Sequence, residues 1–573
     1  MPDHVESRTE HQGQISKVER YSREAVARLV QVFETQKNEN SISERKYADN
    51  VGIPRTTLQY WRDRRESLQA SPAAVAFFES PEGVEFLHRF VVASHFVMTW
   101  MGTCGIRLIC LLIELTGLGP FIADSYGAQQ SVSAEMQEAL VKYGEEEQER
   151  LATDMPHKKI TACEDETFLS EGICLVAMEP GSGFILLEDY VEQRDAETWD
   201  TKMAKATKGL DIEVIQVTAD EGSAIGLHTK KMGAKHAPDL FHPQHDVCRA
   251  MALPLASKEA KAKDAYVEAM GEALRQIEAE RAYREGPRGP GRPPDFARRI
   301  QEAQAVEEET ARHLNRIRKH RLGWRAAVHG IEELYHPFNL DSGAPQPADK
   351  VSEGLESQFD VIMKIAEEEG LSEACKDRIG KARRIVPKMV STVAFFHGEV
   401  QRRIEDLRLP PDQERLLLDN LIPSAYLQGA ASKTQDHDKK ARLRKTLDEL
   451  QSERLFPGSP ASHLTAEEQR TLEKIAYECA EVFQRSSSCI EGRNGLLELW
   501  EHAMRRLQPK KLRGLTVVHN YFIKRPDGMT AAERFFGRAP RDLFDWLLAH
   551  VRLPARSAMN RKIPIRLSLF QCS

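Results

Sequence analysis

Hydrophobic and polar positions change their spacing along the chain, and these changes predict its elements. Between about residues 158 and 240, apolar residues come in short runs rich in strand-forming side chains and separated by turn residues, which is typical of β-strands. The runs include KKITACEDETF, GICLVAMEP, GFILLEDYVEQ and IEVIQVTAD. Helical patterns interrupt them at AETWDTKMAKATKG and EGSAIGLHTKKMG. The predicted order is therefore β-β-β-α-β-α-β, ending at PDLFH.

This order predicts a mixed five-stranded sheet, in which an antiparallel meander is followed by parallel strands joined through helices. It is the order of a ribonuclease-H-like core. From about 245 to 480 the pattern is helical and rich in charge, with a Pro/Gly/Arg linker at 285–296. We expect a multidomain, mostly α protein whose α/β core is interrupted by a large helical insertion.

The segment 41–66 (SISERKYADNVGIPRTTLQYWRDRRE) predicts two short helices across a tight turn. Gly52 supplies the turn and Pro54 opens the second helix, which fits a helix-turn-helix that reads the major groove of DNA. A purely structural helical hairpin is the alternative. Five polar residues are predicted to project outward and contact DNA: Arg55, Thr56, Thr57, Gln59 and Arg62.

Composition narrows the protein class. The 573 residues carry a formal charge of −7, which excludes a uniformly basic coat but not local basic clusters. The nine cysteines form no Cys-x-x-Cys pair, and the N-terminus lacks a secretory hydrophobic stretch, so we expect a cytoplasmic protein. The apolar stretch 90–106 contains His95, Gly102 and Gly105 and is short for a membrane span. We predict buried helices there and no membrane partner.

These patterns divide the chain into five predicted parts. They are a helix-turn-helix domain (1–70), a helical linker domain (71–150), the first part of the core (151–255), the helical insertion (256–480), and a core completion with a C-terminal tail (481–573).

Two acids stand at predicted strand ends, Asp165 after ITACE and Asp220 after VIQVTA. In the predicted sheet these strands are neighbours, so their carboxylates converge. Two convergent carboxylates can hold a pair of Mg²⁺ ions, and a third ligand normally comes from a helix against the sheet. The best candidate is Glu491 in RSSSCIEGRNGLLELW. Glu164, Glu166 and Glu221 are neighbouring acids that spacing alone does not eliminate.

The chain resembles DDE-type transposases of bacterial insertion sequences. The resemblance rests on Asp165-Glu166-Thr167, on Asp220 in TADEGSAIGL, and on Ser487-Ser488-x-x-Glu491-x-Arg493-Asn494-Gly495 followed by VVHNYFIKRPDGMTAAERFFG. It implies that Asp165, Asp220 and Glu491 bind Mg²⁺, or Mn²⁺ in its place, and cleave and join double-stranded DNA at element ends. Arg493 and Asn494 are expected to contact that DNA. The family also implies a homo-oligomer, dimeric or larger, associated with the nucleoid.

Two other functions fit the same residues. One is a catalytically retired transposase that only binds DNA, and the other is a structure-specific nuclease that cleaves without joining. An enzyme for small molecules is disfavoured, because the sequence has neither a nucleotide-binding Gly-rich loop nor a nucleophile–base pair.

Overall fold

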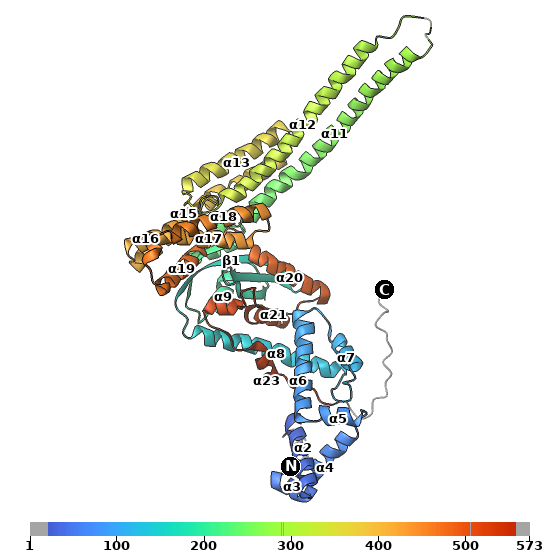
Figure 1. The fold of residues 1–573 in the computed structure, drawn as a ribbon, viewed down its shortest axis with the longest axis vertical. Helices are drawn as coiled ribbons and strands as arrows, with labels where there is room; N and C mark the ends of the chain where they lie inside the picture. Colours follow the sequence, from blue (N-terminus) through green and yellow to red (C-terminus); the bar gives the residue numbers. More distant parts are fainter. Residues whose placement is uncertain (1–20, 288, 290, 505, 557–573) are drawn as a thin grey trace, which may run out of the picture.

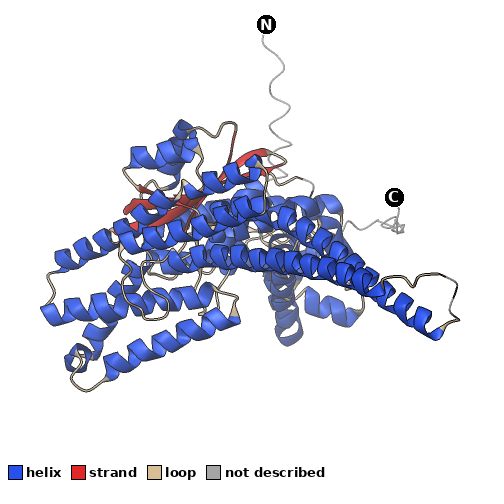
Figure 2. Ribbon diagram, turned by 90° about the horizontal axis from the view of Figure 1, so that it is seen from above, coloured by secondary structure: helices blue, strands red, loops and turns tan. Residues whose placement is uncertain are grey.

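The computed structural model describes residues 21–287, 289, 291–504 and 506–556 (Figure 1). The predicted first and last domains therefore extend beyond the described residues, at 1–20 and at 557–573. The protein is mostly helical and has a small five-stranded sheet, whose strands Figure 2 shows in red among the blue helices. The predicted mostly α architecture around a mixed sheet is confirmed.

The sheet has the strand order β3-β2-β1-β4-β5. The strands β1, β2 and β3 form an antiparallel meander, and β4 and β5 run parallel to β1. Helix α9 (Ala196–Ala206) connects β3 to β4, and α10 (Ser223–Met232) connects β4 to β5, so the predicted order of elements is also confirmed. The strand bounds are β1 Lys158–Leu169, β2 Gly172–Glu179, β3 Phe184–Val191, β4 Ile212–Ala219 and β5 Lys235–Pro238.

The outer edge of β3 is covered by α21 (Pro509–Tyr521). The side chain of Asn520 accepts from the Ile185 backbone N–H at 2.9 Å and donates to the Ile185 carbonyl at 3.0 Å, as a further strand would. The His519 imidazole lies 2.9 Å from the Gly183 carbonyl oxygen. The His-Asn pair of the C-terminal motif therefore satisfies a strand edge that would otherwise be unpaired. Two short helices follow, α22 (Ala531–Phe536) and α23 (Leu543–His550).

The N-terminal part has a small core of its own, built from residues such as Phe33, Tyr47 and Leu58. Gly52 joins the second and third of its helices with a positive φ of 70°, which a residue without Cβ adopts most easily. The predicted pair of short helices across a turn at Gly52 is thus present. The three helices are α2 (Arg23–Asn40), α3 (Glu44–Val51) and α4 (Arg55–Glu66).

The apolar stretch 90–106 folds into helices that pack against the sheet core. Phe96 and Trp100 are almost fully buried in the same hydrophobic cluster as the sheet. No helix within the described ranges combines the length and apolarity needed to cross a membrane. The elements of this part are α5 (Pro72–Phe78), α6 (Pro81–Phe96), the π-helical turn η1 (Val97–Met101), α7 (Ile106–Leu115) and α8 (Tyr126–Ala152).

The helical insertion has a second large core, separate from that of the sheet. Its first two helices, α11 (Phe241–Glu285) and α12 (Phe296–Leu334), form a long hairpin that extends away from the body (Figure 1). The others are α13 (Ala348–Glu368), α14 (Glu373–Arg383), α15 (Val386–Leu407), α16 (Pro411–Leu416), η2 (Leu417–Leu421), α17 (Ile422–Lys433), α18 (His437–Leu455), η3 (Pro460–His463) and α19 (Ala466–Ala480).

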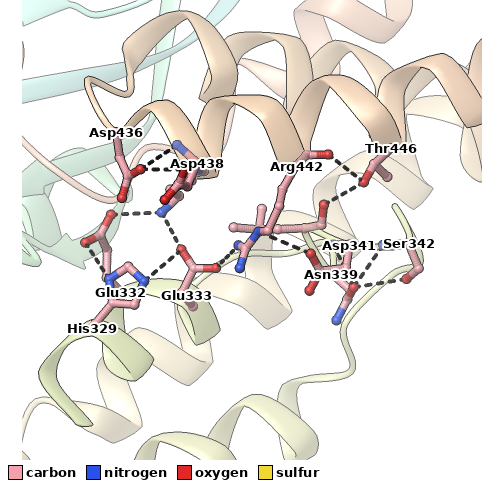
Figure 3. A network of polar contacts seen from close by, with 12 residues as sticks. His329, Glu332, Glu333, Asn339, Asp341, Ser342, Asp436, Asp438, Arg442 and Thr446 are labelled. Carbon is pink, nitrogen blue, oxygen red and sulfur yellow. Dashed lines mark hydrogen bonds and ion pairs between the residues drawn. The ribbon is translucent and has the colours of Figure 1, made fainter. Parts of the chain in front are cut away.

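A network of hydrogen bonds and ion pairs connects α18 with the end of α12, as Figure 3 shows. The ammonium group of Lys439, 6% exposed, lies 2.9 Å from a Glu332 carboxylate oxygen and 2.7 Å from one of Glu333. The hydroxyl of Thr446 donates to the Leu340 carbonyl at 3.0 Å. Glu332 also reaches the chain that returns to the sheet, because Arg485 donates to its carbonyl oxygen at 2.8 Å.

Candidate active site

The register of two parallel strands sets the positions of Asp165 and Asp220. Cys163 of β1 lies opposite Thr218 of β4. Two residues further along the chain from each of these are Asp165, still within β1, and Asp220, which directly follows the last residue of β4. The sheet therefore brings together two acids that are far apart in the sequence.

The returning chain at 482–488 crosses this face before α20 (Ser488–Met504) begins. Three buried polar side chains of the sheet donate to its backbone. They are Thr161 to the Val482 carbonyl (2.7 Å), Gln216 to the same carbonyl (3.2 Å) and Thr218 to the Gln484 carbonyl (3.2 Å). A crossing segment has no strand partner, so these side chains satisfy its buried carbonyls.

The start of α20 is fixed from the end of β5. The buried Ser487 hydroxyl donates to an Asp239 carboxylate oxygen at 2.6 Å, and Ser486 accepts from the Ser488 N–H at 3.1 Å. The motif Pro-Asp-Leu-Phe-His thus contacts the Ser-Ser motif directly. Glu491 follows in the first turn of α20, with its side chain exposed.

Asp165 is half-buried and held from two sides. One carboxylate oxygen accepts from the Glu166 N–H at 2.8 Å, and the other accepts from the Asn494 amide at 2.9 Å. Burial raises the pKa of Asp165 to about 6. The Glu166 N–H opposes that shift, while the negative charges of Glu491 and Asp220 add to it. Asp220 and Glu491 therefore both lie within electrostatic reach of Asp165.

The neighbouring acids differ from these three because each has a cationic partner. Within the described part of the chain, Asp165, Asp220 and Glu491 form no ion pair. The partners of the others are His228 for Glu164 (3.6 Å), Arg194 for Glu166 (3.0 Å) and Lys388 for Glu221.

Carboxylate oxygens are the ligands that Mg²⁺ prefers, so the donor chemistry of the three acids fits the predicted ion. Their arrangement fits it less well. Across residues 21–556, apart from the three undescribed positions, no three His, Cys, Asp or Glu side chains are grouped closely enough to hold a metal ion. The acids would have to move together to share one.

Arg493 does not lie where a DNA contact was predicted. It is 4% exposed, and its guanidinium donates twice to Glu188 of β3, at 2.7 and 2.6 Å. Thr516 donates to the same carboxylate at 2.6 Å. Because Arg493 has no free donor face toward solvent, we assign it to the core instead. Asn494, 8% exposed, also faces inward and orients Asp165.

The α4 surface presents most of the residues predicted to read DNA. Arg55, Thr56 and Gln59 are exposed, and Thr57 is half-buried. Arg62 does not project outward as predicted. Its side chain is 18% exposed and forms an ion pair with Glu34 of α2, at 2.8 Å, and a second one with Glu44 of α3.

Tyr60, which is 54% exposed, lies beside Gln59 on the same helix.

A cleft of about 1100 Å³ lies between the sheet and the insertion and reaches Ser486 and Ser488 at the start of α20. Three of its cations, Lys158, Lys433 and Arg525, form no ion pair with any described residue. The cleft therefore presents cations without ion-pair partners close to the start of the helix that carries Glu491.

A family of unknown function (DUF6399) matches residues 417–563, a range that includes Glu491 and the elements from η2 to α23. No curated protein matches the chain.

Proposed function

We propose that the protein is a DNA transposase that cleaves and joins element ends by phosphoryl transfer. One observation carries the proposal. Three carboxylates without ion-pair partners among the described residues lie on β1, directly after β4 and in the first turn of α20, and the charges of Asp220 and Glu491 both act on Asp165. A ribonuclease-H-like core places its acids on these kinds of elements, as the resemblance implies.

In this proposal Asp165, Asp220 and Glu491 hold Mg²⁺, or Mn²⁺ in its place. The ions would activate the attacking oxygen and stabilise the leaving oxygen. Asn494 orients one oxygen of Asp165 through its amide. The repulsion that raises the pKa of Asp165 is the repulsion that a divalent cation would relieve.

The exposed residues of α4 would read the element ends, and the cleft cations would contact phosphates nearer the acids. Joining two ends requires two protein copies or more, which is consistent with a homo-oligomer on the bacterial nucleoid in the cytoplasm.

The test is a cleavage assay on linear DNA that carries both ends flanking the coding gene, with Mg²⁺ or Mn²⁺ and with EDTA as control. Two of the three acid variants have a matched neighbour: Asp165→Asn against Glu166→Gln, and Asp220→Asn against Glu221→Gln. We expect metal-dependent cleavage and joining in the wild type and in both neighbours. Loss of at least 1000-fold is expected in the two Asn variants and in Glu491→Gln. Wild-type rates in Asp220→Asn would refute the assignment.

The second candidate is a retired transposase that binds DNA without cutting it. The absence of a metal-ready group among the described residues favours it. Binding of end DNA by wild type and Asp220→Asn alike, with no cleavage in either metal, would establish it. Cleavage without joining would instead identify a structure-specific nuclease.

A further inference from the structure

Two cysteines that are far apart in the sequence meet beside the candidate active site. All eight cysteines in the described part of the chain are free thiols. The thiol of Cys163 on β1 and that of Cys489 in the first turn of α20 form a hydrogen bond with each other. Both side chains pack in the same hydrophobic cluster as the sheet. The fold therefore places two thiols in contact, although the sequence contains no Cys-x-x-Cys pair.

Contacts on either side of this cysteine pair fix its position. Three alternate residues of β1, which lie on one face of the strand, contact the returning chain in the order of its sequence. They are Thr161 to Val482 (2.7 Å), Cys163 to Ser486 (3.8 Å) and Asp165 to Asn494 (2.9 Å). Along the chain, Cys489 lies between the second and the third of these contacts. The backbone on both sides of Cys489 is therefore held against β1 independently of the two thiols.

The two thiols differ in their access to solvent. Cys163 is fully buried, whereas Cys489 is half-buried. An oxidant in solution therefore reaches Cys489 first, and Cys163 can react only with the sulfur of Cys489. This is the arrangement of a reactive cysteine next to a resolving cysteine.

We propose that Cys163 and Cys489 form a reversible disulfide that links β1 to α20. The oxidant is a small-molecule disulfide. Cys489 attacks one of its sulfur atoms and releases a small thiol, and Cys163 then attacks the Cys489 sulfur of the mixed disulfide and releases the second small thiol. The protons of both cysteines end on the released thiols, and the small disulfide gains the electron pair that the protein loses. A reducing compartment keeps the pair as thiols, so the link forms only under oxidising conditions.

The link affects the acids because each cysteine precedes one of them by two residues. Asp165 follows Cys163 on β1, and Glu491 follows Cys489 in α20. The acids have to move together to share a metal ion, and a covalent bond between β1 and α20 restricts that movement. Oxidation therefore switches cleavage off. This consequence rests on the proposed function, whereas formation of the disulfide does not.

The test treats the full chain with oxidised glutathione, denatures it in an alkylating agent and maps its peptides by mass spectrometry without reduction. We expect a cross-linked peptide pair that contains Cys163 and Cys489 and that dithiothreitol separates. Cys489→Ser should abolish this pair. The matched control Cys174→Ser, at a buried cysteine of β2 in the same cluster, should retain it. Circular dichroism checks that both variants are folded. Recovery of Cys163 as an alkylated free thiol from the oxidised wild type would overturn the proposal.

Cleavage assays on the same samples test the consequence for activity. Oxidation should lower the wild-type cleavage rate by about tenfold or more, and dithiothreitol should restore it. Cys489→Ser should cleave at the same rate with and without the oxidant. Equal rates for the oxidised and the reduced wild type would overturn the switch. If the reduced wild type cleaves no DNA, the proposed function fails, while the peptide map still decides whether the disulfide forms.

Discussion

Two adjacent acids on opposite faces of β1 have opposite electrostatic surroundings. Glu164 is fully buried and lies 3.6 Å from His228, whose other ring nitrogen contacts Asp200. Asp165 faces the other side, is half-buried, and has two like charges and His242 nearby but forms no ion pair with a described residue. A buried charge with a partner serves the fold. A group of like charges without cationic partners lowers the stability of the fold. Such a group is typical of a functional site, where a ligand compensates the charges.

The strongest test of this distinction is Arg493→Met. Removing the guanidinium leaves Glu188 buried without its partner, so we expect the free energy of unfolding to fall by about 3–5 kcal/mol. Urea denaturation measures this loss. The double variant Arg493→Met/Glu188→Gln should recover part of it. A single variant as stable as the wild type, with weaker DNA binding, would return Arg493 to the DNA contacts.

Glu164→Gln should lower the free energy of unfolding by about 2 kcal/mol at pH 6 and leave the cleavage rate of the folded protein unchanged. Burial lowers the pKa of His228, but Glu164 and Asp200 outweigh it, and the net pKa is raised. A raised histidine pKa contributes stability at low pH that is lost as pH rises through it. The difference from wild type should therefore shrink above neutral pH in urea titrations, and a constant difference would contradict this.

Asp165→Asn should instead raise the free energy of unfolding. The pKa of Asp165 is about 6 against an ordinary 3.8, so the folded state holds its proton longer and stability falls as pH rises between these values. Asparagine avoids this cost. We expect the variant to be about 1–2 kcal/mol more stable than wild type at pH 7.5, after allowing for partial exposure, and equal to it near pH 4. Glu166→Gln, which loses Arg194, should show no such gain in thermal melts.

The smallest effect is expected from Thr218→Val, which removes one donor to the crossing segment at Gln484. We expect a loss of about 1 kcal/mol, because the buried Gln484 carbonyl then keeps only the longer hydrogen bond from the Gln216 amide, at 3.5 Å. Thr229→Val is the matched control, because that buried hydroxyl only repeats a bond to the Ile225 carbonyl within its own helix. Equal losses in chemical denaturation would mean that the crossing segment does not depend on this hydrogen bond.

The local pattern of apolar and polar residues was sufficient to predict the order of strands and helices, because the spacing typical of each element is visible in short windows of sequence. It also placed Asp165 and Asp220 on neighbouring strands, but Asp165 does not lie at a strand end as predicted, because β1 continues to Leu169. Because side chains alternate along β1, the sequence predicts that Asp165 and Glu164 lie on opposite faces of the sheet. It does not predict which face packs against α20, because that depends on where the returning chain crosses the sheet.

Contacts distant in the sequence explain what the sequence did not predict. Arg493 looked like a surface arginine because its partner, Glu188, lies on a strand more than 300 residues earlier. Arg62 likewise finds its acids on two preceding helices. Basic residues near a motif are poor indicators of DNA contact when buried acids are available elsewhere in the fold.

The chain leaves the sheet region at Leu240 and returns at Arg485, and the Leu240 N–H donates to the Arg485 carbonyl at 2.9 Å. One hydrogen bond therefore joins the two ends of the whole insertion. Ends that meet in this way let a long segment be gained or shed with little change in loop-closure entropy for the rest of the chain. The sheet and the acids can thus keep their geometry while the attached helices diverge in length and shape.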